Sequence, residues 1–174
     1  MDNHPHLTGH LDNKESFSAF FRLVNSQFAR IVNKHLKRRG QVVMDRFKSP
    51  VIESDEHMLS AMAYIDLNQH RAKKVNHPKN NDWSSYQYYA YGKADPLITP
   101  CPSYLALGRN SLERQREYRA IVEALIKHRS TMNISHTHFI GNPDWVLMKY
   151  RELCEKLGRK MIEGIVIRLT SPPN

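Results

Sequence analysis

Apolar side chains recur at helical spacing along one long stretch near the start of the chain. From Lys14 to about Lys37 they fall on one broad face of a helix, with polar residues on the other side. A basic cluster and then Gly40 follow, which is typical of a helix end. The pattern therefore predicts an amphipathic helix over this stretch. Its apolar face consists of Phe17, Phe20, Phe21, Val24, Phe28, Ile31 and Val32.

Three further helices are predicted downstream. Ser54 precedes two acidic residues, which is typical of a helix start, and we expect this helix to run to about Asn68. Apolar residues cover much of its circumference, so much of it should be buried. The other two are predicted from Ser111 to about His128 and from Pro143 to Leu157, where proline suits the first turn. The apolar positions of the first of the three are Met58, Leu59, Met62, Ile65 and Leu67.

The remaining segments are short or irregular. Residues 3–11, NHPHLTGHL, predict a short strand with a frayed end, in which Pro5 removes one ladder donor. Residues 41–53 predict a loop with short extended pieces, and residues 76–103 a turn-rich connector with short helical pieces. The last five residues, TSPPN, are expected to be disordered.

Composition and length suit one globular domain with an appended helical tail. Of the 174 residues, 40% are hydrophobic and 25% charged. We expect a first part over residues 1–92 and a connector with a helical tail over residues 93–174. The two cysteines, Cys101 and Cys154, have no metal-like spacing, which favours a reducing compartment. No stretch resembles a membrane span or a signal peptide, so the expected location is the cytoplasm, with no membrane partner.

The net charge of the chain indicates a class of binding partner. The chain has 26 Lys and Arg against 17 Asp and Glu, a net charge of +9 and a pI near 9.7. An excess of this size favours a polyanion, because phosphates neutralise the cations and release counterions. A generally basic cytosolic protein would have the same charge, so charge alone leaves both interpretations open.

Two short patterns suggest chemistry. On a strand, residues two apart share a face, so His4 and His6 can present two imidazoles to one metal ion. On a helix, residues four apart share a face, which sets the phenol of Tyr64 beside the amide of Asn68. Each pattern has an ordinary alternative: a solvated histidine pair near a terminus, of which residues 136–138 hold a second example, and a core tyrosine.

Four blocks arrive in a fixed order: MDNHPHL, GQVVMDRF, YIDLNQHRAKKV and WSSY. Together they resemble the HUH single-tyrosine transposases, in the branch called REP-associated tyrosine transposases. Members of that branch carry patterns similar to MPNHVHLL, GxLWxxRF, YIxLNPVRAGLV and WSSY. The downstream segments DPLITPCPSYLALG and FIGNPDWVLMKY are similar to the tail of longer members. The ordered combination is far more specific than any single block.

The resemblance implies a function. It implies that Tyr64 is a nucleophile, and that His4, His6 and Asn68 bind Mg²⁺ or Mn²⁺. It implies an α+β fold of the ferredoxin-like HUH nuclease type, with DNA cleaved and rejoined through a 5′-phosphotyrosine. Single-stranded DNA, usually beside a hairpin, would be the substrate. Members act as dimers or as monomers, so a homodimer stays open.

The chain also departs from the family pattern. It begins three residues before His4, where family members have further strands and a helix, so we expect an incomplete ferredoxin-like domain. Pro5 stands between the two histidines, Gln69 replaces a proline, and Val43 replaces a tryptophan. Three alternatives therefore remain: a working transposase, a nucleic-acid-binding remnant without catalysis, or a decayed copy without function.

Several basic and aromatic side chains are candidates for contacts with DNA. Tyr86, Tyr88, Tyr89 and Tyr91 are candidate stacking platforms for bases, but packing against the preceding helix is an equal alternative, above all for Tyr86 and for Trp83. For the basic residues the alternative is a solvated helix face. The DNA-binding candidates are Arg30, Lys34, Lys37, Arg38, Arg39, Arg46, Lys48 and Arg71.

Overall fold

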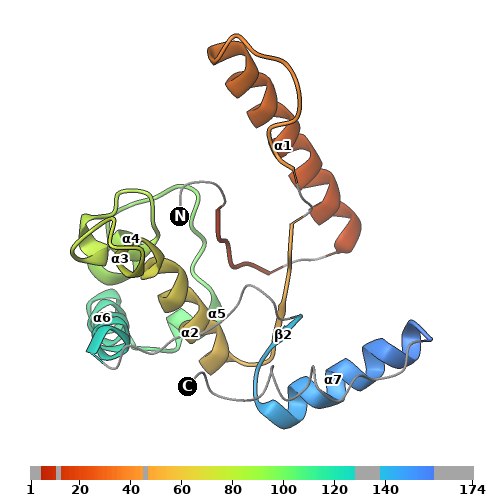
Figure 1. The fold of residues 1–174 in the computed structure, drawn as a ribbon. Coiled ribbons are helices and arrows are strands. Elements are labelled where there is room, and N and C mark those ends of the chain that lie inside the picture. Colours follow the sequence, from red (N-terminus) through yellow and green to blue (C-terminus); the bar gives the residue numbers. More distant parts are fainter. Residues whose placement is uncertain (1–4, 11–12, 45–46, 128–137, 159–174) are drawn as a thin grey trace. The chain divides into compact units, whose positions relative to one another are not determined.

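A computed structural model describes residues 5–10, 13–44, 47–127 and 138–158. These residues form a mixed α/β structure that is mostly helical and contains one two-stranded parallel sheet (Figure 1). The predicted combination of many helices with little strand is confirmed at this level. The chain divides into two compact units, which we call the inserted unit, Gly9–Ser49, and the core unit, Met1–Thr8 with Pro50–Asn174.

The inserted unit contains helix α1, Lys14–His35. The side chain of Asn13 caps its start by accepting a hydrogen bond of 2.7 Å from the backbone N–H of Ser16. Its end differs from the prediction, because the helix stops at His35 rather than at Lys37. Lys37 itself adopts a left-handed conformation with φ of 48°, so the chain reverses before it reaches Gly40.

The apolar face of α1 is only partly covered. The rings of Phe17 and Phe21 lie 4.9 and 5.2 Å from the ring of Phe47, which comes from the segment that follows the helix. By contrast, Phe28 and Ile31 are 52% and 67% exposed. Aromatic packing therefore stabilises the first turns of α1 within this unit, while the later apolar positions remain accessible.

Within the core unit, the first helices follow one another closely. Helix α2 spans Asp55–Asp66, and α3 spans Asn68–Arg71 after a single linking residue. The prediction of one helix to about Asn68 is therefore correct in position, but the helix is interrupted at Leu67. A 3-10 helix, η1 (Pro78–Asn80), and the short α4 (Tyr86–Tyr91) follow, as expected for a turn-rich connector with helical pieces.

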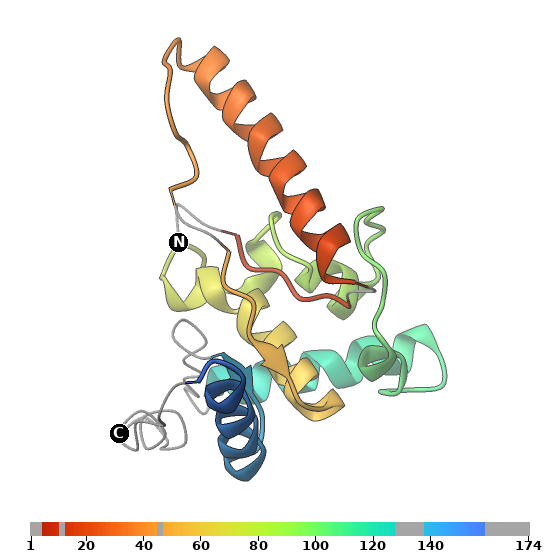
Figure 2. The same cartoon turned by 90° about the vertical axis from the view of Figure 1, so that its right-hand side faces the viewer.

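Two more helices complete the bundle. They are α5, Pro102–Leu105, and α6, Ser111–Lys127. Helix α6 packs against α4, α5 and α2, and α5 packs against α2 (Figure 1 and Figure 2). The predicted α6 is confirmed up to Lys127, and His128 lies outside the described residues. The expected boundary between residues 92 and 93 lies inside this unit.

Tyrosines form much of the hydrophobic core. Tyr86, Tyr89, Tyr104 and Tyr118 are each at most 7% exposed and pack with Met62, Ala63, Leu67, Ala90 and Val122. The rings of Tyr89 and Tyr104 lie 4.7 Å apart, and the hydroxyl of Tyr104 donates a 2.9 Å hydrogen bond to the carbonyl of Tyr89. A core of this kind needs a polar partner for its hydroxyls, which gives it more directional contacts than an aliphatic core.

A short parallel sheet joins two distant parts of the core unit. Strands β1 (Val51–Ile52) and β2 (Phe139–Ile140) pair with Val51 opposite Phe139. Helix α7, Pro143–Lys156, follows β2, and the side chain of Asn142 caps its start. The predicted last helix and the role of Pro143 in its first turn are confirmed.

The strand predicted over residues 3–11 is not formed by the described residues of that segment. Residues 5–10 have no strand conformation, and residues 3, 4 and 11 lie outside the description. A strand requires a hydrogen-bonded neighbour, which an alternating pattern alone does not supply, and Pro5 has no N–H to donate. The C-terminal residues TSPPN also lie outside the description.

Candidate functional site

Tyr64 lies in the last turns of α2. The helix begins after Ser54, whose hydroxyl accepts a 3.4 Å hydrogen bond from the backbone N–H of His57. Acidic residues in the first turn suit the positive end of the helix dipole. Ala63, just before Tyr64, is fully buried, whereas Tyr64 itself is half-buried. The phenol therefore stands at the edge of the core rather than within it.

Asn68 follows at the start of α3. Leu67 links the two helices in a helical conformation, with its N–H bonded to the carbonyl of Ala63 at 3.0 Å and its own carbonyl accepting from the N–H of Arg71 at 2.9 Å. The backbone thus stays nearly helical across the interruption. The side-chain nitrogen of Asn68 is enclosed, and among the described residues it has no hydrogen-bond partner.

Arg71 contacts the ring of Tyr64. The carbon atom of its guanidinium lies 4.6 Å from the centroid of that ring, which is the distance of a cation–π contact. Seven residues make about two helical turns, so this contact means that Tyr64 and Arg71 share one helical surface. Asn68, four residues after Tyr64, lies between them on the same surface. Partial burial lowers the pKa of Arg71, while the neighbouring Tyr64 raises it.

Asp66 connects this segment to the rest of the core. It is fully buried, and its two carboxylate oxygens accept hydrogen bonds of 2.7 Å from the hydroxyls of Ser85 and Tyr118. Burial raises its pKa from 3.8 to about 6, although both hydroxyls lower it. The contact joins the YIDLN block to the WSSY block and to α6. It fixes the end of α2, where Tyr64 stands.

The predicted metal ligands are placed in part. His6 belongs to the core unit and is half-buried, whereas His4 lies outside the described residues. Among the described residues, no group of three or more His, Cys, Asp or Glu side chains is arranged to hold a metal ion. His4 is not among these residues, and Asn68 would contribute an amide oxygen rather than one of these four side-chain types. The second histidine pair includes His136, which also lies outside the description.

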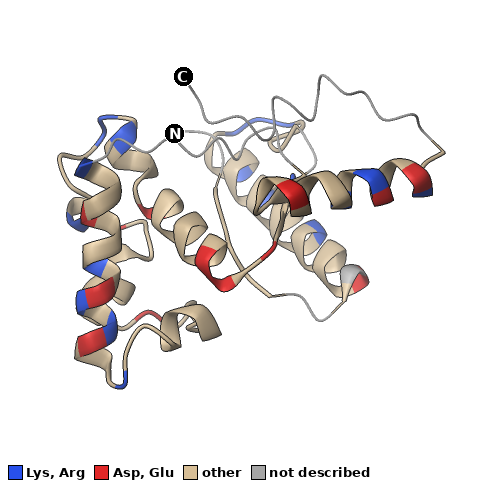
Figure 3. Ribbon diagram, turned by 90° about the horizontal axis from the view of Figure 1, so that it is seen from below, with Lys and Arg blue, Asp and Glu red and all other residues tan. Residues whose placement is uncertain are grey.

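The predicted DNA-binding cations fall into two groups. Arg71 is half-buried, while Arg30, Lys34, Lys37, Arg38, Arg39 and Lys48 are exposed on the inserted unit. Arg38 has a structural role, since its guanidinium donates to the side chain of Asn33 at 3.1 Å and to the carbonyl of Gln41 at 2.8 Å. Arg46 lies outside the described residues. On α6 and α7, by contrast, positive and negative side chains are interspersed (Figure 3).

The aromatic candidates also divide. Tyr86 and Tyr89 are buried, so their rings belong to the core, as the packing alternative predicts. The packing alternative does not hold for Trp83, which is 96% exposed. Tyr91 is half exposed, and Arg119 lies over its ring at 5.3 Å. Trp83 and Tyr91 therefore remain the accessible rings in this part of the chain that a base would reach most easily.

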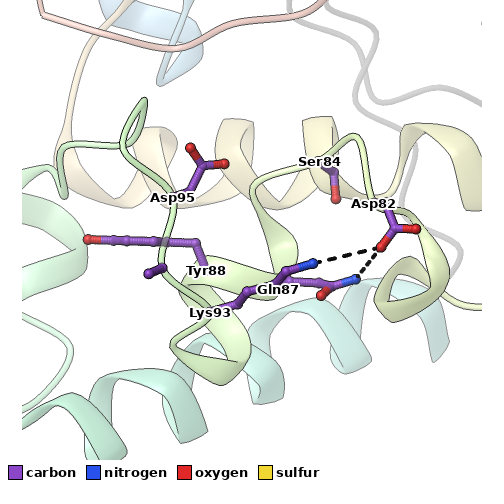
Figure 4. Close-up of a pocket in the computed structure, with 7 residues that line it drawn as sticks. Asp82, Ser84, Gln87, Tyr88, Lys93 and Asp95 are labelled. Carbon is purple, nitrogen blue, oxygen red and sulfur yellow. Dashed lines mark hydrogen bonds and ion pairs between the residues drawn. The ribbon is translucent and has the colours of Figure 1, made fainter.

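A small polar pocket lies beside α4 (Figure 4). The amide of Gln87 donates a 3.2 Å hydrogen bond to Asp82, and the ammonium of Lys93 lies 3.9 Å from the same carboxylate. None of the predicted metal ligands or DNA-binding cations lines it. The lining residues are Asp82, Ser84, Gln87, Tyr88, Lys93, Ala94 and Asp95.

Sequence reasoning missed two features of this region. Asp66 was not predicted to be functional or structural, although a lone carboxylate inside the otherwise apolar run AYIDL is a recognisable sign of a buried polar contact. Arg71 was predicted only as a general contact to DNA. Arg71 follows Tyr64 by seven residues, which is about two helical turns, and this spacing could have predicted their contact.

Comparisons of the chain with protein-family models, with curated proteins and with solved structures each return no match. Among the described helices, none combines the length and the apolar character that crossing a bilayer requires.

Proposed function

We propose that this chain is a tyrosine transposase of the HUH type, which cleaves and rejoins single-stranded DNA through Tyr64. The observation that supports it best is one helical segment that bears a half-buried phenol, an enclosed amide and a guanidinium in cation–π contact with the phenol ring. A nucleophile, a neutral oxygen donor and a cation are the groups that phosphoryl transfer requires. The proposal includes the ferredoxin-like HUH architecture.

The proposed reaction is an in-line displacement at phosphorus. The phenol oxygen of Tyr64 attacks the scissile phosphate as its proton is lost, and the new oxygen–phosphorus bond forms as the bond from phosphorus to the 3′ oxygen breaks. The departing 3′ oxygen takes up a proton and becomes a free hydroxyl. One phosphoester replaces another, so a 3′-hydroxyl from a second strand can reverse the step and join the strands.

A divalent cation fits the side chains that the resemblance assigns to it. Two imidazoles and an amide oxygen suit Mn²⁺ or Mg²⁺. The amide nitrogen of Asn68 is enclosed and has no hydrogen-bond partner among the described residues, so this buried amide is not held by a hydrogen bond from its NH₂ group. His4, His6 and Asn68 would hold the ion. Bound there, it would polarise a phosphate oxygen.

The proposed partner is single-stranded DNA beside a hairpin, in the cytoplasm, with the protein acting as a monomer or a homodimer. The exposed cations of the inserted unit would contact phosphates, and Trp83 and Tyr91 would offer faces to unpaired bases.

A second candidate is a nucleic-acid-binding protein without catalysis. The observation that favours it is the distribution of charge, since residues 9–49 contain nine Lys and Arg against three Asp and Glu. This gives the inserted unit a net charge of +6 out of +9 for the whole chain. Such a surface binds phosphates whether or not Tyr64 reacts.

The test is to trap the covalent intermediate. The protein is incubated with Mn²⁺ and a single-stranded hairpin oligonucleotide that carries different labels at its 5′ and 3′ ends. Because phosphorus stays with the 3′ fragment, we expect the 3′ label to migrate with denatured protein and the 5′ label to appear on a shorter free strand. Tyr64→Phe should form no adduct, and a chelator should prevent it.

The matched control is Tyr150→Phe, which removes the hydroxyl of a half-buried tyrosine on α7 and should leave the adduct unchanged. An adduct that persists in Tyr64→Phe would assign the chemistry to another side chain. A folded wild-type protein that binds the hairpin and forms no adduct would favour the second candidate.

A further inference from the structure

The contact between Arg71 and Tyr64 places a cation over the ring of the proposed nucleophile. A guanidinium is planar, with its N–H donors directed outward in its plane and its faces free of donors. Here its central carbon lies 4.6 Å from the ring centroid of Tyr64. The contact therefore uses the positive charge of the guanidinium on the electron-rich ring face.

The ring that Arg71 contacts is that of the proposed nucleophile, Tyr64. The hydroxyl oxygen of a tyrosine extends from the ring in the ring plane, so a cation above the ring is within a few ångströms of whatever the oxygen attacks. Arg71 is also half-buried, and this partial desolvation lowers its pKa. A desolvated cation gains more from an anionic ligand than a cation in water does.

We propose that Arg71 binds the scissile phosphate and holds it against Tyr64, with one face on the phenol ring and its edge donors on a non-bridging phosphate oxygen. This inference rests on the proposed function and assigns one residue of the phosphate site. The contact would fix both reactants at once, because the same guanidinium orients the ring and the phosphate. It would also offset negative charge that accumulates on the oxygen during attack.

Arg71 thereby differs from the exposed cations of the inserted unit. Those side chains would contribute affinity through phosphates along the strand, and any one of them would contribute little to the reaction. Arg71 acts at the reacting phosphate, so its loss should affect the rate of adduct formation much more than the affinity for DNA. Its planar shape matters as well as its charge.

The experiment compares Arg71→Gln, Arg71→Lys and a matched control, Arg151→Gln, in the full chain. Arg151 is exposed on α7, so its variant loses the same charge away from Tyr64. Two quantities are measured with the end-labelled hairpin and Mn²⁺: the single-turnover rate of adduct formation and the dissociation constant from fluorescence anisotropy. Both are measured at one fixed salt concentration.

We expect Arg71→Gln to slow adduct formation by about 100-fold, as removal of one transition-state donor does, with less than about a 10-fold loss of affinity. Arg71→Lys should recover only a small part of the rate, since an ammonium cannot stack and donate in the same way. Arg151→Gln should react at the wild-type rate. If Arg71→Gln loses its helical circular dichroism, Arg71→Lys, which keeps the charge, decides the question.

Failure of this inference is distinct from failure of the proposed function. If wild-type protein forms no adduct, the transposase proposal fails, and the inference that depends on it fails with it. If wild-type protein forms the adduct and Arg71→Gln reacts as fast as Arg151→Gln, only the role of Arg71 is overturned. A fully active Arg71→Lys would likewise show that charge alone suffices and overturn the proposed geometry.

Discussion

Asp66 is the side chain on which the position of Tyr64 depends. A carboxylate at 0% exposure is costly unless its oxygens are satisfied, and here hydroxyls from α4's flank and from α6 satisfy both. Even so, desolvation outweighs these hydrogen bonds and raises the pKa to about 6. The folded chain consequently holds this proton at mildly acidic pH, where the unfolded chain has released it.

The sign of the effect on stability follows from linkage. Between pH 4 and 6 the folded state binds more protons than the unfolded state, so the free energy of unfolding falls as the pH rises through this window. A shift from 3.8 to about 6 corresponds to about 3 kcal/mol. We expect the difference in unfolding free energy, wild type minus Asp66→Asn, to decrease by about this amount between pH 4 and pH 7. Urea denaturation at several pH values measures it.

Tyr118→Phe supplies the comparison for this prediction. It removes one hydroxyl that lowers the pKa of Asp66, with almost no change in shape, so the fall in stability should extend to higher pH. A difference between wild type and Asp66→Asn that stays flat from pH 4 to pH 7 would contradict the assigned cause of the shift.

At the level of single residues, part of the candidate site could be predicted from the sequence. Tyr64 and Asn68 were selected by motif and by spacing, and the contact between Arg71 and Tyr64 shows that residues seven apart share one helical surface here. The placement of the Asn68 amide beside the Tyr64 phenol stays a prediction. The hydroxyl partners of Asp66 come from positions 19 and 52 residues away, and no local pattern specifies contacts at such separations.

Helix α1 ends in a left-handed turn that is formed by a lysine rather than by the glycine that usually occupies such a position. The N–H of Arg38 bonds to the carbonyl of Asn33 at 2.9 Å, and the N–H of Lys37 to that of Lys34 at 3.3 Å. This pair of bonds is the Schellman motif, in which the left-handed position is usually glycine. Here Lys37 occupies it with φ of 48°.

Lys37→Gly should therefore stabilise α1. A non-glycine residue in the left-handed region costs roughly 1 kcal/mol, which glycine avoids. We expect hydrogen exchange of the α1 amides in the full chain to slow by about 5-fold, the factor that corresponds to this energy. Exchange followed by mass spectrometry, on peptides that cover residues 14–35, is the measurement.

Lys34→Gly is the matched control, since it makes the same replacement three residues earlier within the helix. There glycine lacks the conformational advantage, so exchange should become faster. Equal acceleration in both variants would show that the left-handed position of Lys37 imposes no strain.

Helices were predictable as elements, while their ends and partners were less so. Ser54, Ser111 and Pro143 marked the starts of α2, α6 and α7 correctly. Caps such as Ser54 and first-turn prolines such as Pro143 act locally, and the cap of α6 is the neighbouring Asn110, whose side chain accepts a 2.9 Å hydrogen bond from the N–H of Glu113. The end of α1 was misplaced, since Gly40 was taken as the stop while Lys37 adopts the turning conformation. The strand predicted over residues 3–11 is not seen in the described part of that segment, residues 5–10, because strand formation depends on pairing with a distant part of the chain.

Across the whole molecule, charge and the proposed chemistry belong to different units. The inserted unit has a net charge of +6, while Tyr64, Arg71 and Asp66 belong to the core unit. Removing cations from the inserted unit should therefore change affinity for DNA and its dependence on salt without changing the reacting groups.

The corresponding prediction uses Arg30→Gln, Lys34→Gln and Arg39→Gln together. These residues are exposed, and the set leaves out two cations with structural roles. Arg38 donates hydrogen bonds to the loop after α1, and Lys37 forms the left-handed turn. We expect weaker binding to single-stranded DNA and a plot of log affinity against log salt that is shallower by about 2, from about 0.7 for each lost phosphate contact. Fluorescence anisotropy at several salt concentrations provides both values.

Three exposed arginines of the core unit serve as the control for total charge, and they are Arg109, Arg116 and Arg151. Changing these three to glutamine removes the same charge and should leave the salt dependence close to that of wild type. If the two triple variants behave alike, net charge rather than the inserted unit determines affinity.

The hydrogen bonds of Asp66 also bear on how such a chain changes over generations. Three positions in separate parts of the sequence, 66, 85 and 118, share one polar contact inside an aromatic core. A lineage that replaces one of them passes through an ancestor with a buried group left unsatisfied. These positions should therefore vary together or hardly at all. An insertion between α2 and α6 should be tolerated only if the hydroxyls at positions 85 and 118 still reach the carboxylate at position 66.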